Sequence, residues 1–570
     1  MNKQRIVAGL ASVAMASTLV ACSGGSSSDA KTLTVSVNQS LTGQFTPQYA
    51  SSAYDQYVVN LCYESMLKYN ADNELEPVLA KDLPEVSEDG LTVTYKLEKG
   101  HKFSDGTEVT AKDVKFTFAT LADPSYAGPN GGGLENLVGY KEYNSGAAKE
   151  LTGIETPDDY TVVFHLVSPQ IDAVSTFGAM GITSADHYSK YKPGKVKVVE
   201  KNQEETCGSG AYQLKSYDKA SGASFVRNEE FKPEKGQYQV DRIVMKKTDV
   251  TTEVSELKKG TVDLIPEVIE TNKVSEASQD DNMAFNYYTR GAVGFVAMNA
   301  NNGATADKAV RQALMYATDR QGFCDSYFGW DKKASDEVKK VKGGYVPAAY
   351  WNPASESLGA VVRNEETIDG LNTYAFDMDK ANQVLDEAGW VRGADGIREK
   401  DGQKLEIKFL LSEGNSVLET LIPIVKKTWG DLGVDLKQTT VDFSTLLSNI
   451  QDTSHDSEWN MCFLATSFTS NQDSSANDSY TNVPANMAVN NYSRINDQAL
   501  IDQLTKARAD SDEKQSKVDY AEAMKMAADD AGYMPVYSGM MFNLYNKKVD
   551  MTGTGTLRNW SQSMDTITVK

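Results

Sequence analysis

Histidine and the sequence signatures of catalysis are both scarce in this chain. The 570 residues include only four histidines, His101, His165, His187 and His455, and no two of them lie within one helical turn. A local zinc site built on histidine is therefore not expected. The chain also lacks the G-x-S-x-G, H-E-x-x-H, P-loop and G-x-G-x-x-G motifs of hydrolases, metalloproteases and nucleotide-binding enzymes. We expect no enzyme activity, no metal and no cofactor, although a carboxylate pair for glycoside hydrolysis stays open because its spacing is spatial.

Positive charge is the second deficit. The chain has 57 Lys and Arg against 79 Asp and Glu, so its formal net charge is −22. A chain this acidic lacks the basic surface that nucleic-acid binding requires. Hydrophobic residues make up 40% and charged residues 24% of the sequence, which excludes disorder over the whole chain. Because 570 residues exceed what one hydrophobic core usually supports, we expect at least two lobes.

Long apolar runs are absent after the first residues. Lys3 and Arg5 precede an uncharged stretch, 6–21, which is too short for the roughly 20 residues of a membrane span and is typical of a signal peptide. It ends in Leu19-Val20-Ala21-Cys22 and a Gly/Ser stretch, an arrangement that resembles the bacterial lipobox. We predict a signal peptide at 1–21, lipidation of Cys22 and a flexible tether over 22–30. The alternative is an ordinary signal peptide with a chance cysteine.

The remaining cysteines, Cys62, Cys207, Cys324 and Cys462, match no metal-binding spacing. An exported protein could pair them in three ways, and four buried free thiols are an equally good interpretation.

Strand-like and helix-like patterns alternate along the mature chain, which predicts an α/β or α+β fold. Strands are expected at 32–37, 91–97, 161–167, 212–215, 243–247, 262–265 (ended by Pro266), 293–299 and 405–411, and helices at 306–323, 379–388, 416–432, 498–508 and 514–529. A capping box, Thr110 to Asp113, predicts a further helix start. The final segment, 534–570, returns to strand character, so the first lobe is expected to be discontinuous. The polar run 467–479 is interpreted as a solvated loop.

Several short sequence motifs follow one another along the chain. They are Leu91-Thr92-Val93-Thr94-Tyr95-Lys96-Leu97, Phe103-Ser104-Asp105-Gly106-Thr107, Gly208-Ser209-Gly210-Ala211-Tyr212, Val310-Arg311-Gln312-Ala313-Leu314, Ala381 to Trp390 and Pro535-Val536-Tyr537. This ordered set resembles the oligopeptide- and dipeptide-binding solute receptors of ABC importers, across almost the whole mature chain.

The resemblance implies an α/β, two-lobed periplasmic-binding-protein-like clamshell with a discontinuous first lobe and an extra subdomain. The main lobe is expected at 31–70, 200–292 and 540–570, the subdomain at 71–199 and the second lobe at 293–539. The implied function is that of a substrate-binding lipoprotein, a monomer anchored on the extracytoplasmic face of the cell membrane. It would capture peptides between closing lobes and deliver them to the permease subunits. Alternatives are the same scaffold binding an oligosaccharide or a metal chelate, or a surface hydrolase or adhesin.

The resemblance also implies ligand-binding residues. In the family, an Asp that follows an aromatic residue in a second-lobe loop pairs with the peptide's amino group. Here Phe468 takes the aromatic position, but Asn471 stands where the Asp is expected. Either the loop is shifted and Asp473 serves, with plain solvation as the alternative for that residue, or the ligand lacks a free amine at this point. Tyr537 is the candidate aromatic of the cleft wall, with core packing as the alternative.

Overall fold

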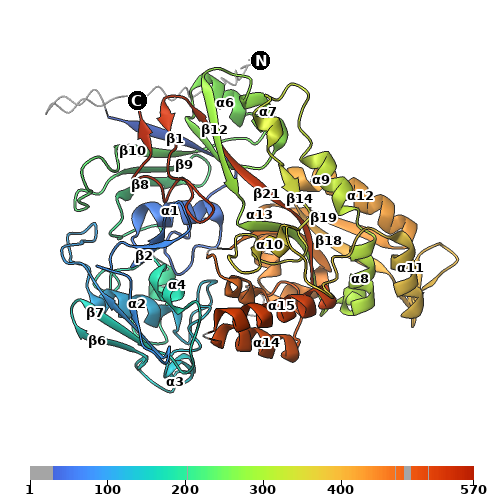
Figure 1. Cartoon of the computed structure of the whole chain (residues 1–570), viewed down its shortest axis with the longest axis horizontal. Coiled ribbons are helices and arrows are strands. Elements are labelled where there is room, and N and C mark those ends of the chain that lie inside the picture. The colour runs from blue at the N-terminus through green and yellow to red at the C-terminus, as the bar shows by residue number, and fades with distance from the viewer. Residues whose placement is uncertain (1–29, 202, 469, 481–489, 511) are drawn as a thin grey trace, which may run out of the picture. The chain divides into compact units, whose positions relative to one another are not determined.

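A mixed sheet of twelve strands runs through the fold in the computed structural model, which describes residues 30–201, 203–468, 470–480, 490–510 and 512–570 (Figure 1). The strands are β1 (Thr32–Val37), β8 (Tyr212–Asp218), β9 (Gly222–Arg227), β10 (Arg242–Lys247), β11 (Leu264–Val268), β12 (Met283–Thr289), β13 (Ala292–Met298), β14 (Gly344–Tyr345), β18 (Glu406–Ser412), β19 (Asp435–Val441), β20 (Met461–Ser467) and β21 (Tyr533–Asn546). The sheet has the order β19-β18-β20-β13-β21-β11-β1-β10-β9-β8, and β12 and β14 pair with β21. Residues 31–570 form one compact unit.

The long strand β21 belongs to both lobes. Its first part pairs with β13. Its second part, from Met540 onward, pairs with β12, and Figure 1 labels both β12 and β21. Only Arg290 and Gly291 separate β12 from β13 along the chain, and the Arg290 amide donates to the carbonyl of Gly539 at 2.9 Å. The chain passes between the two lobes at the β12–β13 link and again within β21, and these two passages lie side by side. We call this region, Arg290–Gly291 and Ser538–Gly539, the strand crossing.

The first lobe packs its core from the two ends of the chain. β1 pairs in parallel with β10 and β11, and its buried Leu33, Val35 and Val37 face a core that also contains Trp560 and Ile567. Further elements here are α1 (Ala53–Cys62), α6 (Glu253–Lys259), α7 (Thr271–Ala277), β22 (Val549–Asp550) and β23 (Thr568–Val569). The return of the chain to this lobe explains the strand character of the last segment.

The subdomain has its own sheet, in the order β4-β5-β7-β6, and its own core. The capping box holds: the Thr110 amide donates to Asp113 Oδ2 at 2.9 Å at the start of α2. Phe164 stacks on Phe177 at 4.3 Å between centroids, and Phe118 meets Phe164 edge-on. The elements are β2 (Leu67–Tyr69), β3 (Leu75–Pro77), β4 (Glu85–Val86), β5 (Thr92–Lys96), α2 (Ala111–Leu121), α3 (Tyr140–Asn144), β6 (Ile154–Asp158), β7 (Thr161–His165), α4 (Ala173–Gly178) and α5 (Lys197–Glu200).

The second lobe has a core on each face of its sheet. All seven residues of β13 are buried, with Val296 and Met298 in one core and Phe295 and Ala297 in the other. Successive side chains of a strand point to opposite faces, so a continuous apolar run suits a strand covered on both sides. The covering elements are η1 (Gly303–Ala306), α8 (Lys308–Tyr316), α9 (Arg320–Tyr327), η2 (Val338–Lys340), α10 (Gly359–Val362), α11 (Met378–Glu387), β15 (Val391–Arg392), β16 (Arg398–Lys400), β17 (Gln403–Lys404), α12 (Ser416–Leu432), α13 (Phe443–Ile450), η3 (Thr453–Glu458), η4 (Asp473–Ser479), α14 (Gln498–Ala509) and α15 (Glu513–Asp530).

Three local predictions were wrong. The stretch 306–323 is not one helix but η1 and α8 followed by α9, because Asp319 caps α9 by accepting from the Gly322 amide at 2.8 Å. Pro266 does not end its strand, since β11 continues to Val268 with a register shift, and a bulge tolerates proline.

The third wrong prediction concerns the polar run 467–479. Its last seven residues form η4, in which Asp473, Ser474 and Asn477 are buried. Polar side chains can be buried when they are hydrogen-bonded. Ser474 meets this condition by donating to Asp172 at 2.6 Å.

The four cysteines expected in the mature chain are all buried free thiols. Among the helices of the described residues, none combines the length and apolar character needed to cross a membrane. Residues 1–29, including Cys22, lie outside the described part of the chain.

Candidate functional site

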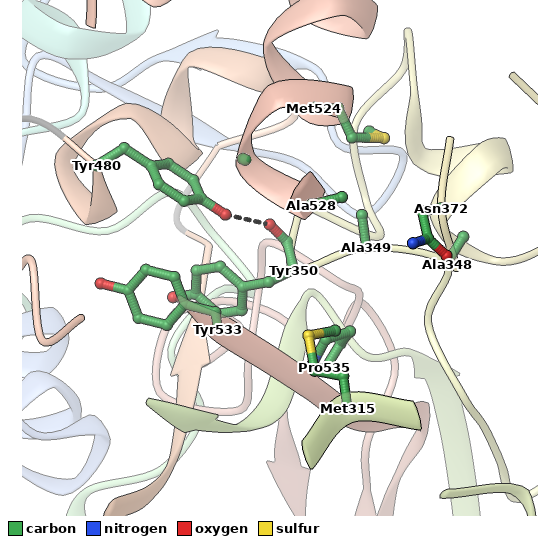
Figure 2. Close-up of a pocket in the computed structure, with 11 residues that line it drawn as sticks. Met315, Ala348, Ala349, Tyr350, Asn372, Tyr480, Met524, Ala528, Tyr533 and Pro535 are labelled. Carbon is green, nitrogen blue, oxygen red and sulfur yellow. Dashed lines mark hydrogen bonds between the residues drawn. The ribbon is translucent and has the colours of Figure 1, made fainter. Parts of the chain in front are cut away.

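The cavity in the second lobe is too small for a solute. It is lined by Tyr350, Tyr480, Tyr533, Met524 and neighbouring residues, and Figure 2 shows the Tyr480 hydroxyl donating to the Tyr350 carbonyl at its edge. Its volume of about 10 Å³ is that of about one water molecule. A solute site must therefore be sought elsewhere.

A cluster of buried polar groups lies beside the strand crossing. Tyr57 on α1 donates to Glu267 Oε2, and Tyr288 on β12 donates to Glu267 Oε1 at 3.2 Å. Burial raises the pKa of Glu267, an effect that the tyrosine hydrogen bonds and the charge of Arg290 oppose. Glu267 has a φ of 56°, a conformation that non-glycine residues rarely adopt. Such strain is concentrated at functional sites, so it marks this cluster as a candidate.

Arg290, at the strand crossing, is the cation of the cluster. Its guanidinium carbon lies 4.9 Å from the centroid of the Tyr537 ring. The side chain is only 6% exposed, and its Nε and Nη1 find no hydrogen-bond acceptor among the described residues.

The cluster continues into contacts between the two lobes. The Tyr327 and Ser416 hydroxyls of the second lobe are 2.7 Å apart, and Ser416 donates to Glu270 Oε1 of the first lobe at 3.5 Å. Lys273 pairs with both Glu270, at 3.1 Å, and Glu253. Tyrosine hydroxyls, carboxylates and one unpaired guanidinium thus line the junction of the lobes. This set can bind a solute through hydrogen bonds and charge.

A second junction joins the subdomain to the second lobe. Arg508 on α14 makes two hydrogen bonds to Asp172, at 2.9 and 2.8 Å, and its carbonyl accepts from the Ile171 amide at 3.0 Å. The Arg508 charge holds the pKa of Asp172 below its usual value against the opposing effect of burial. Ser474 completes this junction through its bond to the same carboxylate.

Asp478 lies at the same junction, against Gly132 of the subdomain. Burial, followed by the charge of Glu135, raises the pKa of Asp478 to about 6. Asp172 acts in the same direction, whereas Arg508 opposes it.

The structure places the predicted site residues in three settings. Phe468 is buried in a second-lobe core, 6.0 Å from Tyr350 between ring centroids. Asn471 lies between lobes: its amide donates to Glu356 and, at 3.3 Å, to the carbonyl of Asn73.

Asp473 is 4% exposed, and its Oδ1 accepts from the Trp351 indole at 2.9 Å. Burial raises the pKa of its carboxyl group. Tyr537 is 2% exposed and packs against Phe323 and Phe328, with Arg290 over its ring. Two of the four predicted residues reach the strand crossing: the Tyr537 ring lies against Arg290, and the Phe468 amide donates to the carbonyl of Gly291 at 2.7 Å.

Sequence reasoning missed Glu267 and Arg290. The available signal was the strand Met283–Thr289, whose tyrosine-rich end runs into Arg290-Gly291 directly before the buried β13. An arginine directly before a fully buried strand is unusual because its charge requires a partner. Glu267 gave no signal of its own, since it directly follows the proline at which the strand was expected to end. Among the described residues, no group of three His, Cys, Asp or Glu side chains could hold a metal ion.

Comparison with known proteins agrees with this architecture. The family model described as "Bacterial extracellular solute-binding proteins, family 5 Middle" matches residues 74–487, well over half of the chain. The oligopeptide-binding protein AppA of Bacillus subtilis is 24% identical over 507 residues, covering 86% of this chain and 83% of AppA.

Solved structures show the same fold. The structure of B. subtilis AppA in complex with a nonapeptide has a TM-score of 0.78 at 20% identity, covering 95% of this chain and 99% of AppA. Lactococcal OppA, complexed with an endogenous peptide in the closed conformation, has a TM-score of 0.80 at 18% identity, covering 95% of this chain and 100% of OppA. The fold is therefore the two-lobed α/β clamshell that the sequence predicts.

Proposed function

Because the chain belongs to the family 5 bacterial extracellular solute-binding proteins, we propose that it captures peptides and delivers them to the permease subunits of an ABC importer. Family membership over residues 74–487 carries the proposal, and the peptide-binding names of AppA and OppA support the ligand class. The lobes at 31–70, 200–292 and 540–570 and at 293–539, with the subdomain at 71–199, would close on the peptide. Closure would exclude water and pair the peptide's backbone groups, which are costly to bury unpaired.

Mass spectrometry of solute that co-purifies with the protein tests this function. We expect a mixture of short peptides, and calorimetry with synthetic copies should give saturable binding. Recovery of an oligosaccharide or a metal chelate, with no peptide binding, would replace the peptide by that solute.

Lipid anchoring at Cys22 is part of the proposal. The lipobox-like end of the leader supports it. Cys22→Ala should leave the protein unprocessed or move it from the membrane fraction to the soluble fraction, because two joined acyl chains hold a protein on a bilayer. Fractionation and gel mobility measure this, with Cys62→Ala as the matched control. Identical behaviour of Cys22→Ala and the wild type would contradict the anchor.

Asp473 is proposed as the carboxylate that receives the peptide's amino group. Its Oδ1 accepts from Trp351 and Ser355 also hydrogen-bonds the carboxyl group, so the amine would bind at the acceptor positions that these two partners leave. Asp473→Asn should weaken binding of a free-amine peptide by more than the roughly 1 kcal/mol of an exposed ion pair. Calorimetry with free-amine and N-acetylated versions of one peptide tests whether the amino group contributes to binding. Equal affinity of the wild type for both versions would remove this role.

A further inference from the structure

The guanidinium of Arg290 differs from those of other buried arginines in this chain. Arg320 donates to the carbonyls of Pro535 and Thr373, at 3.0 and 2.7 Å, and Arg398 pairs with Asp386 at 2.6 Å. Arg494 is paired with Asp456. Arg290 is buried to the same degree, yet no side chain of the described residues forms an ion pair or hydrogen bond with its guanidinium.

The nearest anion does not neutralise Arg290. Glu267 is close enough for the Arg290 charge to affect its pKa, but no ion pair joins them within 4.0 Å. The Glu267 oxygens instead accept from Tyr57 and Tyr288. The Tyr537 ring supplies the remaining attraction, a cation–π contact on one face of the guanidinium. A buried cation without an anionic partner is strongly unfavourable, so its retention requires an explanation.

The position of Arg290 between the lobes explains why an unpaired arginine is buried there. Arg290 lies at the strand crossing, where its amide is bonded to Gly539. The groups around it come from both lobes: Tyr57, which donates to Glu267, belongs to the first lobe, and Tyr327 belongs to the second. A solute held between the lobes at this point would face the free guanidinium donors. Arginine presents its donors in a planar fork that fits a carboxylate with two parallel hydrogen bonds.

We propose that Arg290 binds a carboxylate of the captured solute at the strand crossing. The inference rests on the proposed peptide function and names the ligand group that this site selects. In a peptide, the carboxylate is either the C-terminal one or an Asp or Glu side chain.

A competition experiment tests the site. Short synthetic peptides free of Asp and Glu are prepared as free acids, as C-terminal amides, and as amides that carry one Glu. Bound peptides are quantified by mass spectrometry. The wild type should favour a carboxylate-bearing set over plain amides by about 10- to 100-fold, the range for hydrogen bonds to charged groups. Preference for the free acids identifies the C-terminal carboxylate, and preference for the Glu amides identifies the side chain.

Variants separate a binding role from a structural one. Arg290→Gln should bind all three sets alike, and Arg290→Lys should keep part of the preference. Arg363→Gln, which removes an arginine that is already paired with Glu365, should keep all of it. The melting temperature of ligand-free Arg290→Gln should equal or exceed that of the wild type, because the variant removes a buried unpaired charge. A lower melting temperature, or wild-type binding that ignores the carboxylate, overturns the proposal. Failure of the wild type to bind any peptide set would instead count against peptide capture, and the melting comparison would still decide the role of Arg290.

Discussion

Asp172→Asn is expected to weaken peptide binding by more than about 100-fold while leaving the folded lobes intact. In the structure, Asp172 and Arg508 join the subdomain to the second lobe, with side chains only 7% and 16% exposed. Removing one partner of a buried pair costs about 3–5 kcal/mol, because the other charge stays buried and uncompensated. In an open form, water would solvate Arg508, so the penalty falls on closure. Apparent affinity decreases in proportion to the closed population.

Calorimetry measures the affinity, and solution scattering with saturating peptide measures the compaction. Asp186→Asn is the matched control, since it breaks a carboxylate–lysine pair with Lys112 whose two side chains are 61% and 57% exposed. That change should alter affinity less than about 3-fold. If Asp172→Asn binds and compacts like the wild type, the pair does not hold the closed state.

Peptide affinity is expected to rise about 10-fold as the pH falls from 7 to 5. Burial and Glu135 raise the pKa of Asp478 to about 6, from an ordinary value of 3.8. At pH values between these two pKa values, Asp478 is protonated to a greater extent in the closed form than in an open form in which it is hydrated. Closure is therefore penalised above pH 6 and favoured as the pH falls toward 4.

Asp478→Asn tests the assignment. The variant should bind more tightly than the wild type at pH 7 and should lose most of the pH dependence between 5 and 7. Glu135, Asp172 and Arg508 are the charged groups that act on this carboxyl group. A pH profile that is unchanged in Asp478→Asn would assign the effect to another group.

The sequence predicts the strands and helices of this fold well where the spacing of apolar residues matches the face that the element buries in the core. β1, β13 and α12 have bounds within a residue of the expected ones, because each has the periodicity of the surface that it buries. Prediction failed where a local cap was overlooked. Asp319 caps α9 and so separates this helix from α8.

The site was less predictable than the fold. Its members lie far apart in the sequence and meet only because β12, β13 and β21 converge. Tyr57 and Glu267, which are hydrogen-bonded, are 210 positions apart. The cost of burying Arg290 depends on what surrounds it, and no local pattern encodes that environment. Asn471 and Asp473 could be chosen by resemblance, but their partners, Asn73 and Trp351, could not.

The shared strand β21 also determines the order in which this protein can be completed as it emerges from the ribosome. β1 is made first, yet its lobe needs Tyr533–Asn546 to continue the sheet and Trp560 and Ile567 to fill the core. The subdomain, by contrast, draws nearly all of its core from one stretch, residues 66–182. The subdomain can therefore form early from local contacts, whereas the first lobe must wait for the last forty residues or so. The nascent chain thus carries an unfinished N-terminal lobe until synthesis ends, a state that is exposed to proteolysis.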